Sequence, residues 1–287
     1  MPTPLTDRTI EGKPVYSRVL DSGSELVFAE TTSVASYQYK DIAPEINDYF
    51  AEVELVSVVN WHQGTNAPEN IFCAHSTADV QSGVYGPTSS RKLSALLRAL
   101  EVSRKQSNLA DWKTLAEASH WSGTMVGRPA EELLTIKPPV IDLEIGSSPS
   151  SWSNPEAHKV VIDSLANIHR SCTSDPTIVF CGGIHFEPSL SESLLINQAA
   201  FNVGLILPNQ WLVSGGYDQP ESIERLELAV QSLCEPVSGF CYHDNLKGSY
   251  KAVIRQAAER LKLPSFNHRK LRDPAFLAEL RLNTEVK

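Results

Sequence analysis

Cysteine is scarce in this sequence and is not arranged for cross-linking. The five cysteines are odd in number and include no Cys-x-x-Cys pair: Cys73, Cys172, Cys181, Cys234 and Cys241. Such a scattered set is typical of a reducing compartment and excludes a disulfide scaffold or a cysteine-rich zinc site. Long apolar runs are lacking too, since no stretch reaches the roughly 18 apolar residues that span a bilayer. The N-terminus has no apolar segment after its charges, so we expect a cytoplasmic protein without a signal peptide.

Several familiar catalytic and nucleotide-binding signatures are also missing. The chain has no Gly-x-Ser-x-Gly nucleophile elbow, no His-Glu-x-x-His zinc motif, no Walker loop and no Gly-x-Gly-x-x-Gly turn. Its composition is nevertheless that of a globular protein with a sizeable core, because 41% of the 287 residues are hydrophobic and 21% are charged. Function must therefore be sought in less familiar polar clusters.

Charge is unevenly distributed along the chain. The whole chain has 25 basic and 34 acidic residues, a net charge of −9. Residues 245–287 contain 10 basic and 4 acidic side chains, which gives +6 there and −15 over the rest. A basic segment on an acidic protein favours local binding of a polyanion, and a solvated helical face explains the same pattern equally well.

Short apolar runs alternate with amphipathic helical patterns. Continuous apolar runs predict strands of a sheet covered on both faces, and they lie at Leu55–Val59, Ile71–Cys73, Val140–Ile145, Ile178–Cys181, Leu205–Leu207 and Phe240–Tyr242. Helical patterns cover Arg91–Lys105, a segment capped by Asn154, a segment after Asp218, and residues 249–262. This alternation predicts an α/β fold of three layers (α/β/α), with a mixed, mostly parallel sheet in the middle.

Domain organisation follows from the absence of linkers. No long Pro-, Gly- or Ser-rich segment divides the chain, so we expect one α/β domain over residues 21–287, with residues 245–287 as its basic helical segment. Residues 1–20 are weakly patterned and are expected to form a mobile arm. The sequence gives no expectation for the oligomeric state.

Polar clusters follow several of the predicted strands. They are Phe72–Thr77, Ala116–Gly123, Ile141–Ser148, Cys181–Pro188 and Tyr242–Gly248. Open α/β sheets bind ligands outside the carboxyl ends of their strands, so these segments are candidate parts of a site. Glu144 lies inside an apolar strand, where a buried carboxylate needs a cation or hydrogen-bond donors. A single histidine at the end of a strand is more often a hydrogen-bonded structural residue than a catalyst.

Taken in order, these segments resemble the archaeal and plant type of D-aminoacyl-tRNA deacylase. That family shows six motifs in order: Ser-Arg-His-Ser, Glu-Ala-Thr-His-His-Gly-Pro, Val-Glu-Ile-Gly-Ser with a Trp soon after, Gly-Gly-x-His-Tyr-Ala-Pro, a Gly-His-Ile strand and Asp-x-Lys-Gly-Leu. The counterparts here are Cys73–Ser76, Glu117–Gly123, Leu143–Ser147 with Trp152, Gly182–Pro188, Val203–Pro208 and Asp244–Gly248. The resemblance implies a fold related to nucleoside phosphorylases and peptidyl-tRNA hydrolases. It also implies an enzyme that acts on the ester bond of aminoacyl-tRNA.

Candidate site residues follow from this resemblance, because ester cleavage needs a base and hydrogen-bond donors for the developing oxyanion. The candidate catalytic residues are His120, His185 and Glu144. The candidate substrate-binding residues are His75, Ser76, Glu117, Trp121, Gly146, Ser147, Gly182, Gly183 and Glu187. The candidate tRNA-binding residues are Arg91, Arg98 and Lys105 on one predicted helix, and Lys247, Lys251, Arg255, Arg260 and Lys262 near the C-terminus.

The chain departs from the family pattern at three places. His-His-Gly-Pro is replaced by His120-Trp121-Ser122-Gly123, the histidine of a Gly-His-Ile strand is Leu205, and Glu187 stands where the family has alanine. Zinc has been associated with archaeal members. Because two candidate histidines are missing here, we regard a zinc site as doubtful and expect no cofactor.

Three functions fit these observations. The first is hydrolysis of D-aminoacyl-tRNA. The second is attack on the ester by an amine, as in a tRNA-dependent aminoacyl transferase or cyclodipeptide synthase, with Glu187 pairing with an arginine side chain and Trp121 narrowing the pocket. The third is a tRNA-binding protein without catalysis, which predicts that His120, His185 and Glu144 do not converge.

Overall fold

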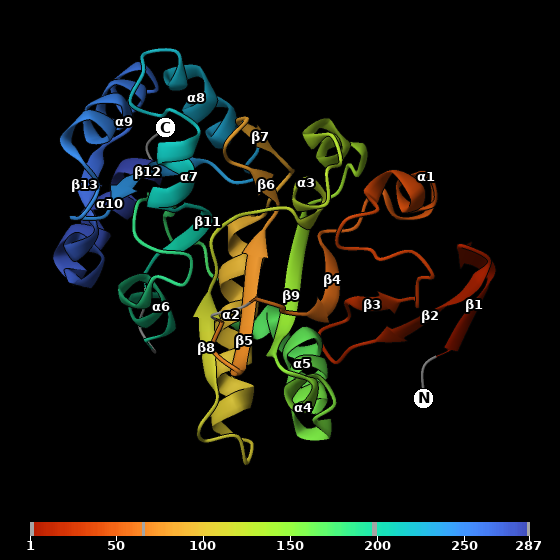
Figure 1. Ribbon diagram of the computed structural model, residues 1–287. Helices are drawn as coiled ribbons and strands as arrows, with labels where there is room; N and C mark the ends of the chain where they lie inside the picture. Colours follow the sequence, from red (N-terminus) through yellow and green to blue (C-terminus); the bar gives the residue numbers. More distant parts are fainter. Residues whose placement is uncertain (1–2, 65–66, 197–199, 286–287) are drawn as a thin grey trace.

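Two four-stranded sheets lie side by side at the centre of the protein (Figure 1). The computed structural model describes residues 3–64, 67–196 and 200–285. The first sheet has the order β4-β9-β5-β8, formed by β4 (Val56–Trp61), β9 (Val140–Ser147), β5 (Asn70–Ser76) and β8 (Lys113–Ala116). The second has the order β11-β10-β12-β13, formed by β11 (Asn202–Leu207), β10 (Thr177–Cys181), β12 (Val237–Tyr242) and β13 (Ser265–Asn267). Among these described strands every pairing is parallel except β5 with β9.

Helices cover both faces of the second sheet. One apolar core lies beneath α2 (Ser90–Lys105), α5 (Pro155–Asn167), α6 (Pro188–Leu195) and α10 (Pro274–Glu285). The other lies beneath α7 (Asn209–Ser214), α8 (Ser222–Gln231) and α9 (Gly248–Arg260). The predicted mixed α/β fold is therefore confirmed, with the strands divided between two sheets. No helix in the described parts of the chain is both long and apolar enough to cross a membrane.

The N-terminal region differs from the expected mobile arm. Its elements are β1 (Thr3–Ile10), β2 (Lys13–Val19), β3 (Glu25–Phe28) and α1 (Tyr39–Phe50), and the three strands form an antiparallel sheet. Ile10 and Val15 are buried in a third apolar core together with Ile42 of α1. Residues 3–19 are thus paired strands that pack on α1, which weak sequence patterning did not predict.

Shorter elements lie between these strands and helices along the chain. They are β6 (Ala78–Asp79), β7 (Val84–Tyr85), α3 (Ser122–Met125) and α4 (Pro149–Trp152), with 3-10 turns at Ala130–Thr135, Ile168–Ser171 and His268–Arg272. Asn154 caps α5 as predicted, because its side chain accepts hydrogen bonds from the backbone N–H groups of Glu156 and Ala157.

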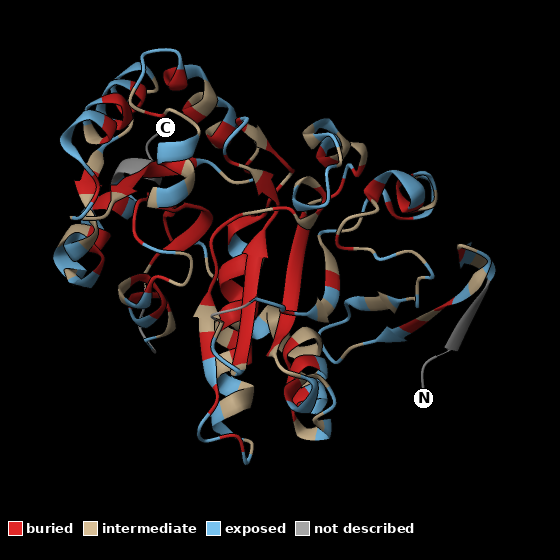
Figure 2. Cartoon of the chain, in the orientation of Figure 1, coloured by how far each residue is buried: buried red, intermediate tan, exposed pale blue. Residues whose placement is uncertain are grey.

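The first sheet has one apolar and one polar face. Side chains alternate along a strand, so Ile141, Leu143 and Ile145 pack into the helical core while Asp142 and Glu144 point the opposite way. In the pairing of β5 with β9, His75 lies opposite Asp142 and Cys73 lies opposite Glu144. These strands are buried along most of their length (Figure 2), so the acidic side chains are in the interior of the protein.

The segment that follows β8 joins the two sheets. The Ser119 N–H donates to the Ile206 carbonyl (2.9 Å), and the Ser119 Oγ accepts a hydrogen bond from the Ile206 N–H (2.8 Å). Ser76 Oγ lies 2.7 Å from Ser119 Oγ and is fully buried. Ser76 was expected to bind substrate, and the structure corrects this, because its hydroxyl supports the connection between the sheets.

Trp121 is also corrected by the structure. Its side chain is fully buried and its ring lies 5.4 Å from that of Tyr39, in the core formed with α1. It therefore cannot narrow a substrate pocket. The indole of Trp121 is a large side chain, and its burial against α1 makes it part of the N-terminal core.

Replacing Trp121 by alanine should lower the free energy of unfolding by about 3–5 kcal/mol, because it leaves a large cavity beneath α1. Urea unfolding would measure the loss. Trp61→Ala is the matched control: this side chain is 57% exposed, so its loss should cost about 0.5 kcal/mol or less. Equal losses in the two variants would show that Trp121 is not a core residue.

Candidate active site

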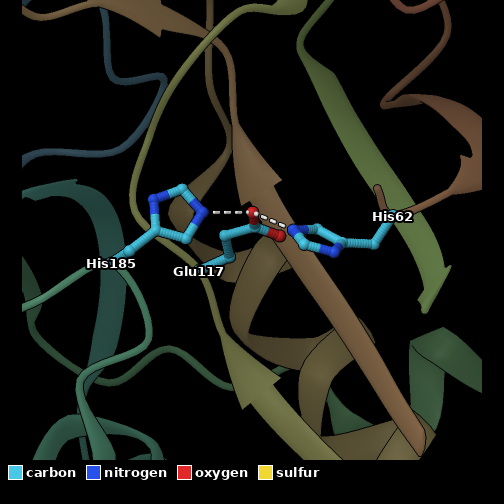
Figure 3. Close-up of side chains that lie close together, drawn as sticks. All are labelled: His62, Glu117 and His185. Atoms are coloured by element: carbon cyan, nitrogen blue, oxygen red, sulfur yellow. Dashed lines mark hydrogen bonds and ion pairs between the residues drawn. The ribbon is translucent and has the colours of Figure 1, made fainter. Parts of the chain in front are cut away.

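A buried carboxylate lies between two imidazoles at the junction of the two sheets (Figure 3). Glu117 Oε1 is 2.6 Å from His185 Nε2 and 3.4 Å from His62 Nε2. Burial opposes ionisation of Glu117, but hydrogen bonding with His185 and His62 outweighs it and holds the pKa of this carboxyl well below its usual range. Glu117 is therefore an ionised group in the interior of the protein.

His62, at the end of β4, was missed by sequence reasoning. Its Nδ1 lies 2.8 Å from Ser147 Oγ, and its backbone carbonyl accepts a hydrogen bond from Trp152 Nε1 (3.2 Å). Gly146 allows the close approach, because a Cβ there would lie 2.8 Å from the Cβ of His62. Burial lowers the pKa of His62, and contact with Glu117 more than reverses this and raises it. Gly146 and Ser147 thus position His62. The sequence signal for this residue is its place just after the predicted strand Leu55–Val59, which would have to be extended to its polar end to include His62.

His185 is the part of this group that reaches solvent. Its side chain is 30% exposed, whereas that of Glu117 is 0% exposed. The preceding turn needs glycine, since Gly183 has φ +77° and a Cβ there would lie 2.6 Å from the Glu187 carboxylate. The rings of Phe186 and Trp211 meet His185 edge to face at 4.8 and 5.5 Å. The His185 ring is therefore held by two aromatic side chains, while part of it remains exposed to solvent.

Three further ionisable groups, His75, Asp142 and Glu144, lie next to Glu117. His75 is fully buried, and its Nε2 is 3.8 Å from Asp142 Oδ2 and 3.9 Å from Glu144 Oε1. Burial lowers the pKa of His75, but the neighbouring carboxylates Glu144, Glu117 and Asp142 raise it to about 10. Burial raises the pKa of Asp142 to about 8 against the opposing effect of His75. His75, Asp142 and Glu144 therefore form a layer of ionisable side chains next to Glu117.

His120 stacks on His75, with ring centroids 3.9 Å apart and an interplanar angle of 25°. Its Nδ1 lies 2.9 Å from the Ala118 carbonyl, so we assign the proton to Nδ1. Burial and the charge of His75 lower the pKa of His120 to about 3. Its ring is 5.3 Å from that of His185. The structure thus brings His120, His185, Glu144, His75 and Glu117 into one cluster.

The Glu187 carboxylate is occupied within the protein. It caps α6 by accepting hydrogen bonds from the Ser189 N–H and hydroxyl, and it also accepts one from the Ile184 N–H. Its Oε1 is 3.6 Å from His243 Nε2, and the residue is 7% exposed. The Glu187 carboxylate is therefore not free to pair with a cationic side chain of a substrate, as the sequence had suggested.

The candidate tRNA-binding residues do not form one surface. Arg98 donates hydrogen bonds to the Phe201 carbonyl and to Asn202 Oδ1, and burial lowers its pKa to about 10, so the structure assigns it an internal role. Arg91 and Lys105 lie on α2, whereas α9 packs in the core on the other face of the second sheet.

Along α9 the basic residues are separated as well. Lys247 and Lys251 lie at its start, Arg255 near its middle, and Arg260 and Lys262 at its end, so the two ends are roughly 20 Å apart. Arg260 pairs with Glu227 of α8 at 2.9 Å.

Several of the clustered side chains are of the types that bind metal ions. The ligand atoms of His62, Glu117 and His185 lie within 4.8 Å of one another, as do those of His75, Glu117 and His120. Zinc takes imidazole nitrogen and carboxylate oxygen ligands, and Glu117 Oε2 is buried without a hydrogen-bond partner among the described residues. The residues therefore fit a divalent cation. The expectation of no cofactor rested on missing histidines, and His62 supplies one from outside the motifs.

The fold and this cluster define an α/β enzyme, because a buried carboxylate that holds a solvent-facing imidazole is an arrangement for proton transfer. A family model described as D-aminoacyl-tRNA deacylase matches residues 49–266, and the chain belongs to that family.

Similar proteins agree with this assignment. A protein of Pyrococcus horikoshii named D-aminoacyl-tRNA deacylase is 26% identical over 263 residues, which cover 89% of this chain and 86% of that one. A Thermococcus onnurineus protein of the same name is 24% identical over 270 residues, with 90% and 88% covered. A crystal structure titled as a conserved protein of unknown function has a TM-score of 0.74 at 17% identity. It covers 95% of this chain and 88% of that one, and it supports the fold alone.

Protonation of His120 should contribute to acid denaturation. Its pKa is about 3 in the folded protein against 6.5 ordinarily, so between these values the unfolded chain binds a proton that the native state does not. Stability therefore falls as the pH drops through this window, by up to about 1.4 kcal/mol per pH unit. In His120→Gln the slope of the unfolding free energy against pH should be smaller in this window, by up to the contribution of one proton. Urea unfolding at a series of pH values measures this slope. An unchanged slope would contradict the buried, uncharged state of His120.

Proposed function

We propose that this protein hydrolyses the ester bond between a D-amino acid and tRNA. Its membership of the D-aminoacyl-tRNA deacylase family and the names of its relatives support the substrate. The observation that carries the chemistry is the 2.6 Å contact between the buried Glu117 carboxylate and the partly exposed His185. Cytoplasmic location and tRNA as partner are parts of the same proposal.

His185 acts as the general base in this proposal. We assign the ring proton to Nε2, which then donates to Glu117 and leaves Nδ1 as an acceptor. Nδ1 takes a proton from water while the water oxygen attacks the ester carbonyl. The C–O bond to the ribose then breaks, and the same proton passes to the ribose oxygen. Glu117 stays ionised and stabilises the imidazolium that forms in between.

Two other parts of the cluster support this reaction. The Gly182 N–H already donates to the Leu207 carbonyl (2.7 Å), and we assign the neighbouring Gly183 N–H as a backbone donor for the developing oxyanion. A divalent cation held by His62, Glu117 and His185 would act as a Lewis acid on the ester and the attacking water, and while it is bound His185 would be a ligand and not the base.

The other two functions have lost their support. Aminoacyl transfer and cyclodipeptide synthesis depended on Trp121 and Glu187 as pocket residues, and the structure buries the first in the N-terminal core and occupies the second. The non-catalytic reading required His120, His185 and Glu144 to lie apart, and they belong to one cluster instead.

The tRNA surface is a basic ridge at the carboxyl end of β12, formed by Lys247, Lys251, Arg255 and Arg269. The Arg269 side chain is 80% exposed, and Lys251 and Arg255 both lie over the ring of Tyr242, at 5.7 and 5.3 Å. Tyr242 ends the strand next to β10, whose own end leads into the loop of His185. The ridge is therefore on the same side of the sheet as the catalytic group.

The activity itself is tested with D- and L-aminoacyl-tRNA. We expect release of the amino acid from the D-ester, and Glu117→Gln should lower kcat by about 10²- to 10⁴-fold, because the base is then no longer oriented. Glu192→Gln is the matched control, since this carboxylate is 69% exposed on the surface, and its kcat should be unchanged. An unaltered kcat in Glu117→Gln would overturn the mechanism.

The ridge is tested by comparing two arginines of the same helix. Arg255→Gln should weaken tRNA binding and reduce the slope of log K against log salt by about one, the effect of one lost phosphate contact. Arg260→Gln removes a guanidinium that is already paired with Glu227, and it should leave both quantities unchanged. Equal effects would show that the whole helix, and not the ridge, holds tRNA.

A further inference from the structure

A second pair of histidines lies beyond the catalytic cluster and has no part in the hydrolysis. His243 follows β12 and His268 follows β13, and these strands are parallel, so the two residues meet at the same edge of the sheet. Their rings stack with centroids 4.1 Å apart and an interplanar angle of 26°. Both side chains are partly exposed. A stacked pair of imidazoles at the edge of a sheet presents a flat surface to a ligand.

This pair is connected directly to the loop of the general base. His243 Nε2 is 3.6 Å from the carboxylate of Glu187, which is two residues after His185. A Cβ on Gly182 would lie 3.0 Å from the Cβ of His243, so the glycine turn and the histidine are in close contact. A ligand seated on the pair would therefore also touch the loop that holds the reacting ester.

The basic ridge begins on the other side of the pair. Arg269 follows His268 in the sequence and pairs with Asp244, which follows His243. Asp244 also accepts a hydrogen bond from the side chain of Asn267. The order along this edge is thus the general base, the histidine pair and the phosphate-binding cations. The end of a tRNA has the same order, with the ester on the terminal ribose, then the terminal base and then the preceding phosphates.

The chemistry around the pair suits an uncharged aromatic ligand. Burial and the neighbouring His243 lower the pKa of His268, which keeps its ring neutral. Asn245 Oδ1 accepts a hydrogen bond from the Asn209 side chain (3.1 Å) and lies 2.6 Å from His243 Nδ1. His268 Nδ1 and Asn209 Oδ1 are buried and make no hydrogen bond within the described residues.

We propose that the His243–His268 pair is the stacking platform for the adenine base at the 3′ end of tRNA. Unpaired bases in RNA are held by stacking on aromatic side chains, histidine among them, and amide side chains hydrogen-bond the edge of adenine. Asn209 and Asn245 provide those amides beside the rings. The proposal rests on the proposed function, since it assigns the terminal nucleotide of the same substrate.

The platform is tested with two small esters that differ only in the base. The D-alanyl ester of adenosine and the D-alanyl ester of methyl riboside share the ribose and the scissile bond. For the wild-type protein, kcat/KM should be on the order of 10- to 100-fold higher with the adenosine ester than with the methyl riboside ester, which is the effect expected from one base–aromatic stack. His268→Ala should abolish this preference, mainly through KM.

Two further variants separate stacking from folding. His268→Phe keeps a flat ring and should retain the preference. His169→Ala removes a histidine from the turn before β10, at the opposite edge of the sheet, and should behave as the wild type. A preference that survives in His268→Ala, or an absence of preference in an active wild-type protein, would overturn the platform while leaving the hydrolysis intact.

An analogue that cannot be hydrolysed makes the two proposals separable. Adenosine with D-alanine in amide linkage on the ribose should bind the wild-type protein and His268→Phe alike, and His268→Ala on the order of 10- to 100-fold more weakly. If neither ester is hydrolysed but this pattern of binding is found, the proposed function fails and the platform stands. Equal binding to all three proteins would overturn the platform.

Discussion

The negative charge of Glu117 is the constraint on which the rest of the site depends. An ionised carboxylate with no exposed surface is tolerated only when donors or cations surround it, and here His185 and His62 contact the same oxygen. The three residues come from a strand end, a segment between two sheets and a glycine turn, so the fold has to bring all three together. His75 adds a positive charge beneath them, and the Asp142 and Glu144 carboxyl groups lie 3.8 and 3.9 Å from its Nε2.

The two-sheet arrangement explains how the charge is used. One sheet supplies the polar face that holds the cluster, and the other supplies His185 on a loop that reaches solvent. Ser119 fastens the connection by exchanging hydrogen bonds with Ile206. The parallel strands β10, β12 and β13 then end at one edge, where the catalytic loop, the histidine pair and the basic ridge follow one another. Hydrolysis and tRNA binding are therefore aligned along a single edge of the second sheet.

The sequence predicted the parts of this site that depend on local pattern. The apolar runs located six of the eight strands of the two central sheets and missed β8 and β13. The polar clusters chosen from the sequence included Glu117, His120 and His185. Properties that depend on distant contacts were not predictable. Trp121 and Ser76 stood in site motifs but are buried by α1 and by the sheet connection, and Arg98 looked like a surface cation until its hydrogen bonds to Phe201 and Asn202 were seen. His62 was missed because its strand runs beyond the apolar residues that signalled it.

The central claim is that one carboxylate holds both imidazoles, and NMR of the histidine ring nitrogens tests it most directly. Spectra of the wild-type protein and of Glu117→Gln would be compared, with His169 as an internal reference away from the cluster. The account predicts that the ring resonances of His185 and His62 both shift when the carboxylate is replaced by an amide, while those of His169 stay in place. Unchanged resonances for either His185 or His62 would contradict a shared contact with Glu117.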